Sequence, residues 1–136
     1  MGTTTAGSAR SIQYYVIAKR WASDLEFFQI ETSFLYDLIV DYFMRLCEPA
    51  HIEKFKRLAK SLTRLEIDKK YVDRVLAEQL KHLELMAEDI IPEDIDSLSE
   101  KQIQLEYLIT DLIKEYRDAK SDLFTLVSNI RKIKAS

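Results

Sequence analysis

The stretch that decides the fold is residues 49–92, PAHIEKFKRLAKSLTRLEIDKKYVDRVLAEQLKHLELMAEDIIP. Its only prolines stand at its two ends, and it contains no glycine. Glycine and proline are the strongest breakers of regular structure, so their absence between residues 50 and 91 favours one long helix. Apolar residues recur in alternating steps of three and four from Phe55 through Leu62 and Leu76 to Ile90. This spacing is typical of a helix that buries a single apolar seam.

The segments on either side repeat the pattern. The only two glycines lie in the first seven residues, and the same alternating step runs from Tyr14 to Leu46 and from Leu98 to Ile133. Helices of this length extend about 50–60 Å, and short connections between equal helices give antiparallel neighbours. The sequence therefore predicts an all-α fold, an antiparallel up-down-up three-helix bundle with coiled-coil-like heptad packing. Four positions of the seam are polar: Thr32, Lys69, Gln79 and Gln102.

One alternative architecture stays open at this point. Charge is dense over Glu66–Lys70, and a break there would give a four-helix bundle. The heptad phase passes through Lys69 without a slip, however, which favours one helix. Lys69 is then expected to lay its aliphatic stem along the seam and extend its ammonium to water.

The order of the elements also predicts a helix start and a register. Ser97 and Glu100 have the spacing of a capping box at the start of the third helix. Pairing the first two helices across the turn near Pro49 places Leu35 beside Leu62. The second connection then brings Leu126 to that layer, and Ala119 to the layer of Phe28.

Length and composition indicate one helical-bundle domain over residues 11–136. Residues 1–10 contain no apolar core and are expected to be a disordered tail or a remnant of expression. The net charge is −3, and no apolar run has the length of a transmembrane helix. Cys47 is the only cysteine, which fits a reducing compartment, so we expect a cytoplasmic protein.

The first helix carries more apolar residues than one seam requires. Its additional positions are Phe27, Ile30, Phe34, Val40 and Met44. Two phenylalanines and an isoleucine facing water together are typical of an interface. The pattern favours a non-enzymatic interaction module that forms a homodimer through this face. A different protein partner, or burial of the face inside the chain's own bundle, are the alternatives.

A second surface gathers positive charge at one end of the predicted bundle. Its members are Lys54, Lys56, Arg57, Lys60, Arg131, Lys132 and Lys134. This basic end could bind an anionic partner such as nucleic acid or an acidic surface, or simply be solvated. Nucleic acid is not expected, because no aromatic residues alternate with these cations.

Signals for catalysis are weak, and we expect no enzyme, catalytic residue, metal or cofactor. Glu48 and His51 have the spacing of a carboxylate-bridged metal site, but such sites need two copies of that motif. His82 could serve a histidine-based phosphocarrier, because phosphotransfer proteins also expose a histidine on a helical bundle. From the sequence alone, no histidine can be assigned to activate the thiol of Cys47.

Overall fold

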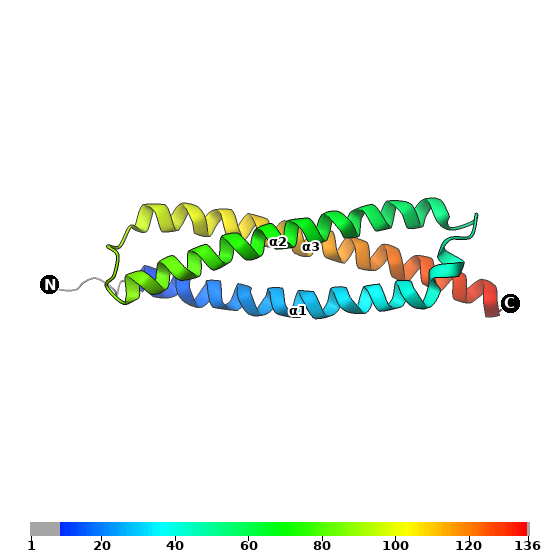
Figure 1. Ribbon diagram of the computed structural model, residues 1–136, viewed down its shortest axis with the longest axis horizontal. Coiled ribbons are helices and arrows are strands. Elements are labelled where there is room, and N and C mark those ends of the chain that lie inside the picture. Colours follow the sequence, from blue (N-terminus) through cyan, green and yellow to red (C-terminus); the bar gives the residue numbers. More distant parts are fainter. Residues whose placement is uncertain (1–8, 136) are drawn as a thin grey trace. The chain divides into compact units, whose positions relative to one another are not determined.

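The computed structural model describes residues 9–135, and the side chains of residues 9–132. Three helices follow one another: α1 Ala9–Leu46, α2 Ile52–Ala87 and α3 Ile95–Ala135 (Figure 1). The described residues include no strand. The predicted all-α three-helix bundle is therefore confirmed. Of the tail predicted over residues 1–10, Ala9 and Arg10 belong to α1, and the remainder lies outside the described residues.

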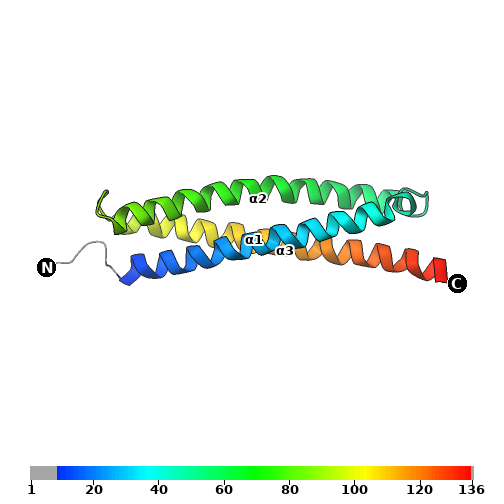
Figure 2. The ribbon, with the colours of Figure 1, turned by 60° about the horizontal axis from the view of Figure 1, so that its bottom comes forward.

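The second helix is continuous, so the four-helix alternative is wrong. α2 runs through Glu66–Lys70 as regular helix (Figure 2). Charged residues are good helix formers when no glycine or proline accompanies them. Lys69 keeps its side chain only 15% exposed, and its Nζ lies 2.7 Å from Oδ2 of Asp73, one turn along. The sequence analysis predicted an ammonium that extends to water; in the structure it is paired with the Asp73 carboxylate.

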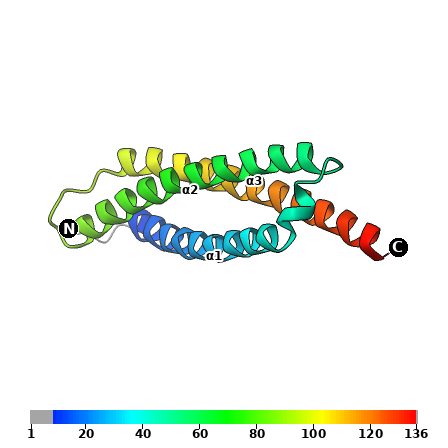
Figure 3. The ribbon, with the colours of Figure 1, turned by 45° about the vertical axis from the view of Figure 1, so that its right-hand side comes forward.

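The first connection, residues 47–51, is a tight turn that contains Pro49 (Figure 3). The carbonyl oxygen of Glu48 accepts hydrogen bonds from the backbone N–H of His51 and of Ile52, both at 2.9 Å. Proline lacks an N–H group, so it fits a turn position that donates no bond. α2 therefore begins three residues after Pro49.

The second connection, residues 88–94, ends α2 and starts α3 earlier than predicted. Asp89 takes a left-handed backbone conformation with φ of 59°, where α2 ends. Asp94 then caps α3: its Oδ1 accepts from the N–H of Ser97 at 3.2 Å, and its carbonyl accepts from Leu98 at 3.1 Å. The predicted capping box at Ser97 is wrong, because Ser97 already lies inside α3 and Asp94 is the cap that accepts its N–H. Ile90, expected in the apolar seam, lies in this connection and is 62% exposed.

The chain divides into two compact units, and each helix contributes to both. The first unit contains the chain up to Glu26 together with Lys69–Thr110. The second contains Phe27–Asp68 and the chain from Asp111 onward. The sequence prediction of one domain over residues 11–136 stays a prediction.

In the first unit, two buried glutamines link all three helices. Gln79 on α2 donates through Nε2 to the carbonyl of Leu98, at 3.2 Å, and to Oε1 of Gln102, at 3.0 Å. Gln102 on α3 donates in turn to the carbonyl of Tyr14 on α1, at 3.2 Å. Buried amides need such partners, so these bonds explain how the predicted seam tolerates glutamine. Among the described residues, no enclosed side-chain nitrogen or oxygen lacks a hydrogen-bond partner.

In the second unit, the buried positions follow the predicted seam, with a shift in register between α1 and α3. The ring centre of Phe28 lies 4.9 Å from that of Tyr116, three residues before the Ala119 predicted for its layer. Leu126 packs in a cluster with Leu46, Phe55 and Ile130, closer to the first connection than predicted. The shift has the sense expected from a third helix that starts one turn earlier, at Ile95.

Candidate interaction surface

The candidate surface lies on the second unit's part of α1, on the side opposite its buried residues. The three residues Phe27, Ile30 and Phe34 are 63%, 67% and 56% exposed. Residues three, four and seven apart lie on one face of a helix, so these side chains form one row, called here the α1 stripe. The buried residues Phe28 and Leu35 occupy the other side of the same turns.

Val40 and Met44, the other two predicted interface residues, are also exposed, at 73% and 83%. They are four residues apart and lie further along α1, turned away from the line of the stripe. Near them, Phe43 is half exposed and packs edge-on against Phe55, with ring centres 5.9 Å apart. All five predicted interface residues are thus exposed in the isolated chain.

A polar network beside the stripe links α1 to α3 in the second unit. The hydroxyl of Tyr116 donates to Oε1 of Glu31 at 2.9 Å, and Nζ of Lys120 donates to the same oxygen at 3.3 Å. These two bonds, the Tyr116 bond first, lower the pKa of Glu31. Burial and the neighbouring Glu31 carboxylate raise the pKa of Tyr116. This network could not be predicted from residue spacing, because Glu31 and Tyr116 lie on different helices, 85 residues apart.

Charged residues border the α1 stripe at both of its ends. Arg20 precedes Phe27 by seven residues, and Asp41 follows Phe34 by seven. Both side chains are exposed, and no ion pair among the described residues involves either of them. Arg20 belongs to the first unit, and Asp41 belongs to the second unit with the stripe.

The predicted basic end lies in the second unit, and its described residues are exposed. Lys54, Arg57 and Asp122 line a shallow depression of about 480 Å³ between α2 and α3. Arg131 donates from Nε to the hydroxyl of Tyr42 at 2.7 Å, with its guanidinium 5.7 Å from the ring centre. The exposed cations also include Lys56, Lys60 and Lys132. The side chain of Lys134 lies outside the described ones.

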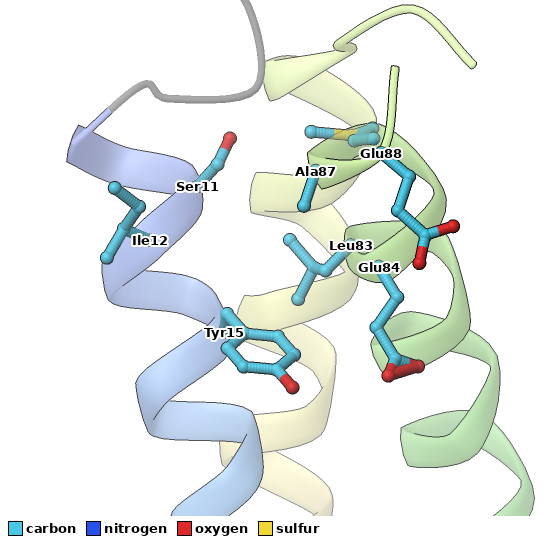
Figure 4. A pocket seen from close by; sticks show the side chains of 8 residues that line it. Ser11, Ile12, Tyr15, Leu83, Glu84, Ala87 and Glu88 are labelled. Carbon is cyan, nitrogen blue, oxygen red and sulfur yellow. The ribbon is translucent and has the colours of Figure 1, made fainter. Parts of the chain in front are cut away.

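A pocket of about 360 Å³ opens between α1 and α2 in the first unit (Figure 4). Tyr15 and Ile12 line it from α1, and the carboxylates of Glu84 on α2 and of Glu88, directly after α2, border it (Figure 4). Ser11, also in its wall, donates through Oγ to Glu93 at 3.0 Å. Sequence periodicity did not predict this pocket.

Of the residues considered for catalysis, Cys47 and His51 lie in the first connection and His82 lies on α2. His51 is buried, His82 is half buried, and Cys47 is exposed. Within residues 9–132, no group of three or more His, Cys, Asp or Glu side chains is placed to hold a metal ion.

Several exposed apolar side chains were not singled out from the sequence. On the first unit these include Tyr71 of α2 with Ile103 and Tyr107 of α3, and on the second Ile67 of α2. Ile103 and Tyr107 are one turn apart, and the Tyr71 hydroxyl accepts from Nε2 of Gln104 at 3.3 Å. None of these groups matches the row of three on α1.

Comparison of the chain with known protein families, with curated proteins and with solved structures finds no match. Among the described residues, no helix has the combined length and apolarity needed to cross a bilayer.

Proposed function

We propose that this chain is a non-enzymatic interaction module, and that it works by self-association through the α1 stripe. The observation that carries the proposal is the exposure of Phe27, Ile30 and Phe34, each more than half accessible in one row. Large apolar side chains gathered on a surface mark interaction sites more often than scattered ones do. The single cysteine supports a cytoplasmic setting.

The magnitudes favour a symmetric pair. A fully buried side chain of this size contributes about 1.5–3 kcal/mol. A two-fold pair covers six such side chains at once. In the single chain, about 60% of the surface of these side chains is exposed and so available for burial. Their burial therefore supplies roughly 5–11 kcal/mol, comparable with the cost of association, about 4–15 kcal/mol. A two-fold pair is also the commonest way to cover one patch with its own copy.

The test is a double substitution, Phe27→Glu with Phe34→Glu. The seam of α1 is untouched, so we expect a folded protein with the same helical circular dichroism. Light scattering should report dimers for the wild-type chain and monomers for the variant at micromolar concentration. Ile67→Glu is the matched control, because Ile67 is also 63% exposed but lies on α2. A control variant that dissociates equally would refute the assignment to this face.

The basic end supports a second candidate, binding of an anionic partner. Lys54, Lys56, Arg57 and Lys60 are exposed within two turns of α2, and Lys56 lies 3.9 Å from the carboxylate of Glu53. Binding to an anionic resin or vesicle should fall steeply with added salt, and Arg57→Glu with Lys60→Glu should abolish it. Retention that is insensitive to salt would rule this candidate out.

A further inference from the structure

The pocket between α1 and α2 in the first unit has an apolar interior. Leu83 and Met86 line it from α2 and are only 3% and 2% exposed, and Ala87 lies beside them. Across from them on α1, Tyr15 is half buried and Ile12 is 54% exposed (Figure 4). The volume of about 360 Å³ falls within the range of sites that hold small organic ligands, about 300–1,000 Å³. An apolar group of that size would gain by covering these side chains.

The border of this pocket is negatively charged. The backbone N–H of Glu88 donates to the carbonyl of Glu84 at 3.1 Å, so the two side chains keep the spacing of one helical turn. Their carboxylates lie on one side of the pocket (Figure 4). Ser11 ties a third carboxylate, that of Glu93, to the pocket wall through its 3.0 Å bond. A cleft bordered by charges of one sign concentrates ions of the opposite sign.

The position of Glu84 and Glu88 costs stability when nothing is bound. Like charges four residues apart on a helix repel one another. Carboxylates at the C-terminal end of a helix also interact unfavourably with its dipole, and the last turn of α2 contains no basic residue. A cation between the two carboxylates would offset both effects, and one ammonium group has enough N–H donors to bond to both.

The chain itself does not neutralise this charge. Among the described side chains, no ion pair involves Glu84 or Glu88. Nζ of Lys19 lies 6.0 Å from the ring centre of Tyr15, at the outer limit of a cation–π contact, but Lys19 does not line the pocket. The negative border is therefore open to a cation from outside.

We propose that this pocket binds a small organic cation, an amine that carries an aromatic or branched apolar body. The body lies against Leu83 and Met86. The ammonium lies between the carboxylates of Glu84 and Glu88. The pocket belongs to the first unit and the α1 stripe to the second, so this site is independent of the proposed self-association.

The test is a titration of the full chain with three probes, followed by the backbone amide signals in nuclear magnetic resonance spectra. The first probe, 2-phenylethylamine, should shift the signals of residues 11–15 and 83–88, with a dissociation constant of about 0.1–5 mM. The second, 2-phenylethanol, has the same body without the charge. It should bind about 3- to 30-fold more weakly at low ionic strength, because it makes no charged contact. Methylamine, the charge without the body, should cause no localised shifts.

Two variants assign the binding to this pocket. Glu84→Gln with Glu88→Gln should weaken binding of 2-phenylethylamine to the level of the alcohol, and it removes a repulsion, so the fold should persist. Glu78→Gln with Glu106→Gln is the matched control, because it removes two exposed carboxylates of the same unit that do not line the pocket. Its dissociation constant should stay within about twofold of wild type. Ala87→Phe, at an exposed position, should fill the pocket and abolish binding of both phenyl probes.

Three results would overturn the proposal. One is the absence of localised shifts with 2-phenylethylamine up to about 20 mM, a concentration that would detect even millimolar affinity. Another is equal binding of the amine and the alcohol, which would show that the carboxylates do not select a cation. The third is equal weakening of binding by the two glutamine double variants, which would indicate general attraction to a negative surface.

Discussion

Leu62 shows how strictly one side chain is held by the core. It is 2% exposed on α2, and it occupies the seam position predicted for it. Leu62→Ala should lower the free energy of unfolding by about 2–5 kcal/mol, from lost transfer energy and an unfilled cavity. Urea denaturation followed by circular dichroism measures this loss. Ile67→Ala on the same helix, at an exposed position, should change stability by less than about 0.5 kcal/mol. Equal losses for the two variants would contradict the assignment of the buried face.

Glu115 carries a pH dependence that can be isolated by one substitution. Burial, followed by the nearby Asp68 carboxylate, raises the pKa of Glu115, while Arg64 opposes the shift. A raised pKa in the folded state means that folding favours the protonated form, so its contribution is full at acid pH and is lost as pH rises through the folded pKa. Glu115→Gln imitates the protonated form.

The Glu115→Gln variant should therefore be more stable than wild type at pH 7, by a few tenths of a kcal/mol, because solvent screens this exposed group. The difference should shrink as the pH falls below about 4, where an unfolded glutamate also becomes protonated. Chemical denaturation of both proteins at several pH values measures it. A variant that is less stable at pH 7 would show that the Arg64 attraction outweighs the other two causes.

At the scale of the elements, the glutamine layer of the first unit sets how the three helices align. Gln79→Ala leaves Oε1 of Gln102 without its donor and removes the side-chain bond to the carbonyl of Leu98. Unmade bonds at buried groups cost about 1–3 kcal/mol, and that loss of unfolding free energy is the expected result. The double variant Gln79→Leu with Gln102→Leu removes both polar groups and should regain most of it. A Gln79→Ala protein as stable as wild type would mean that water replaces the missing amide.

The helices show where sequence periodicity was sufficient and where it was not. The seam positions of α2 were predictable as far as Met86, because a helix must bury one apolar row and no glycine or proline lies between residues 50 and 91. The start of α3 was not, because Asp94 and Ser97 are both good N-cap residues. In the structure Asp94 is the cap, and the connection that leads to it begins near Asp89, with its left-handed backbone. The register of Phe28 against Tyr116 depends on that choice and could not be read from spacing alone.

The candidate surface divides in the same way. The exposure of Phe27, Ile30 and Phe34 follows from helical geometry once Phe28 and Leu35 are assigned to the core. The anchoring of α1 by Glu31, Tyr116 and Lys120 needed the three-dimensional structure, since Glu31 and Tyr116 are 85 residues apart.

At the scale of the whole molecule, the proposed dimer covers the exposed α1 stripe of the bundle with a second copy of the chain. The direct measurement is the solution mass of the wild-type chain by sedimentation equilibrium over a range of micromolar concentrations. The chain has a mass of 16.0 kDa, so if it self-associates, its solution mass should approach twice that figure as the concentration rises. A mass that stays at 16.0 kDa over the whole range would contradict the proposed self-association.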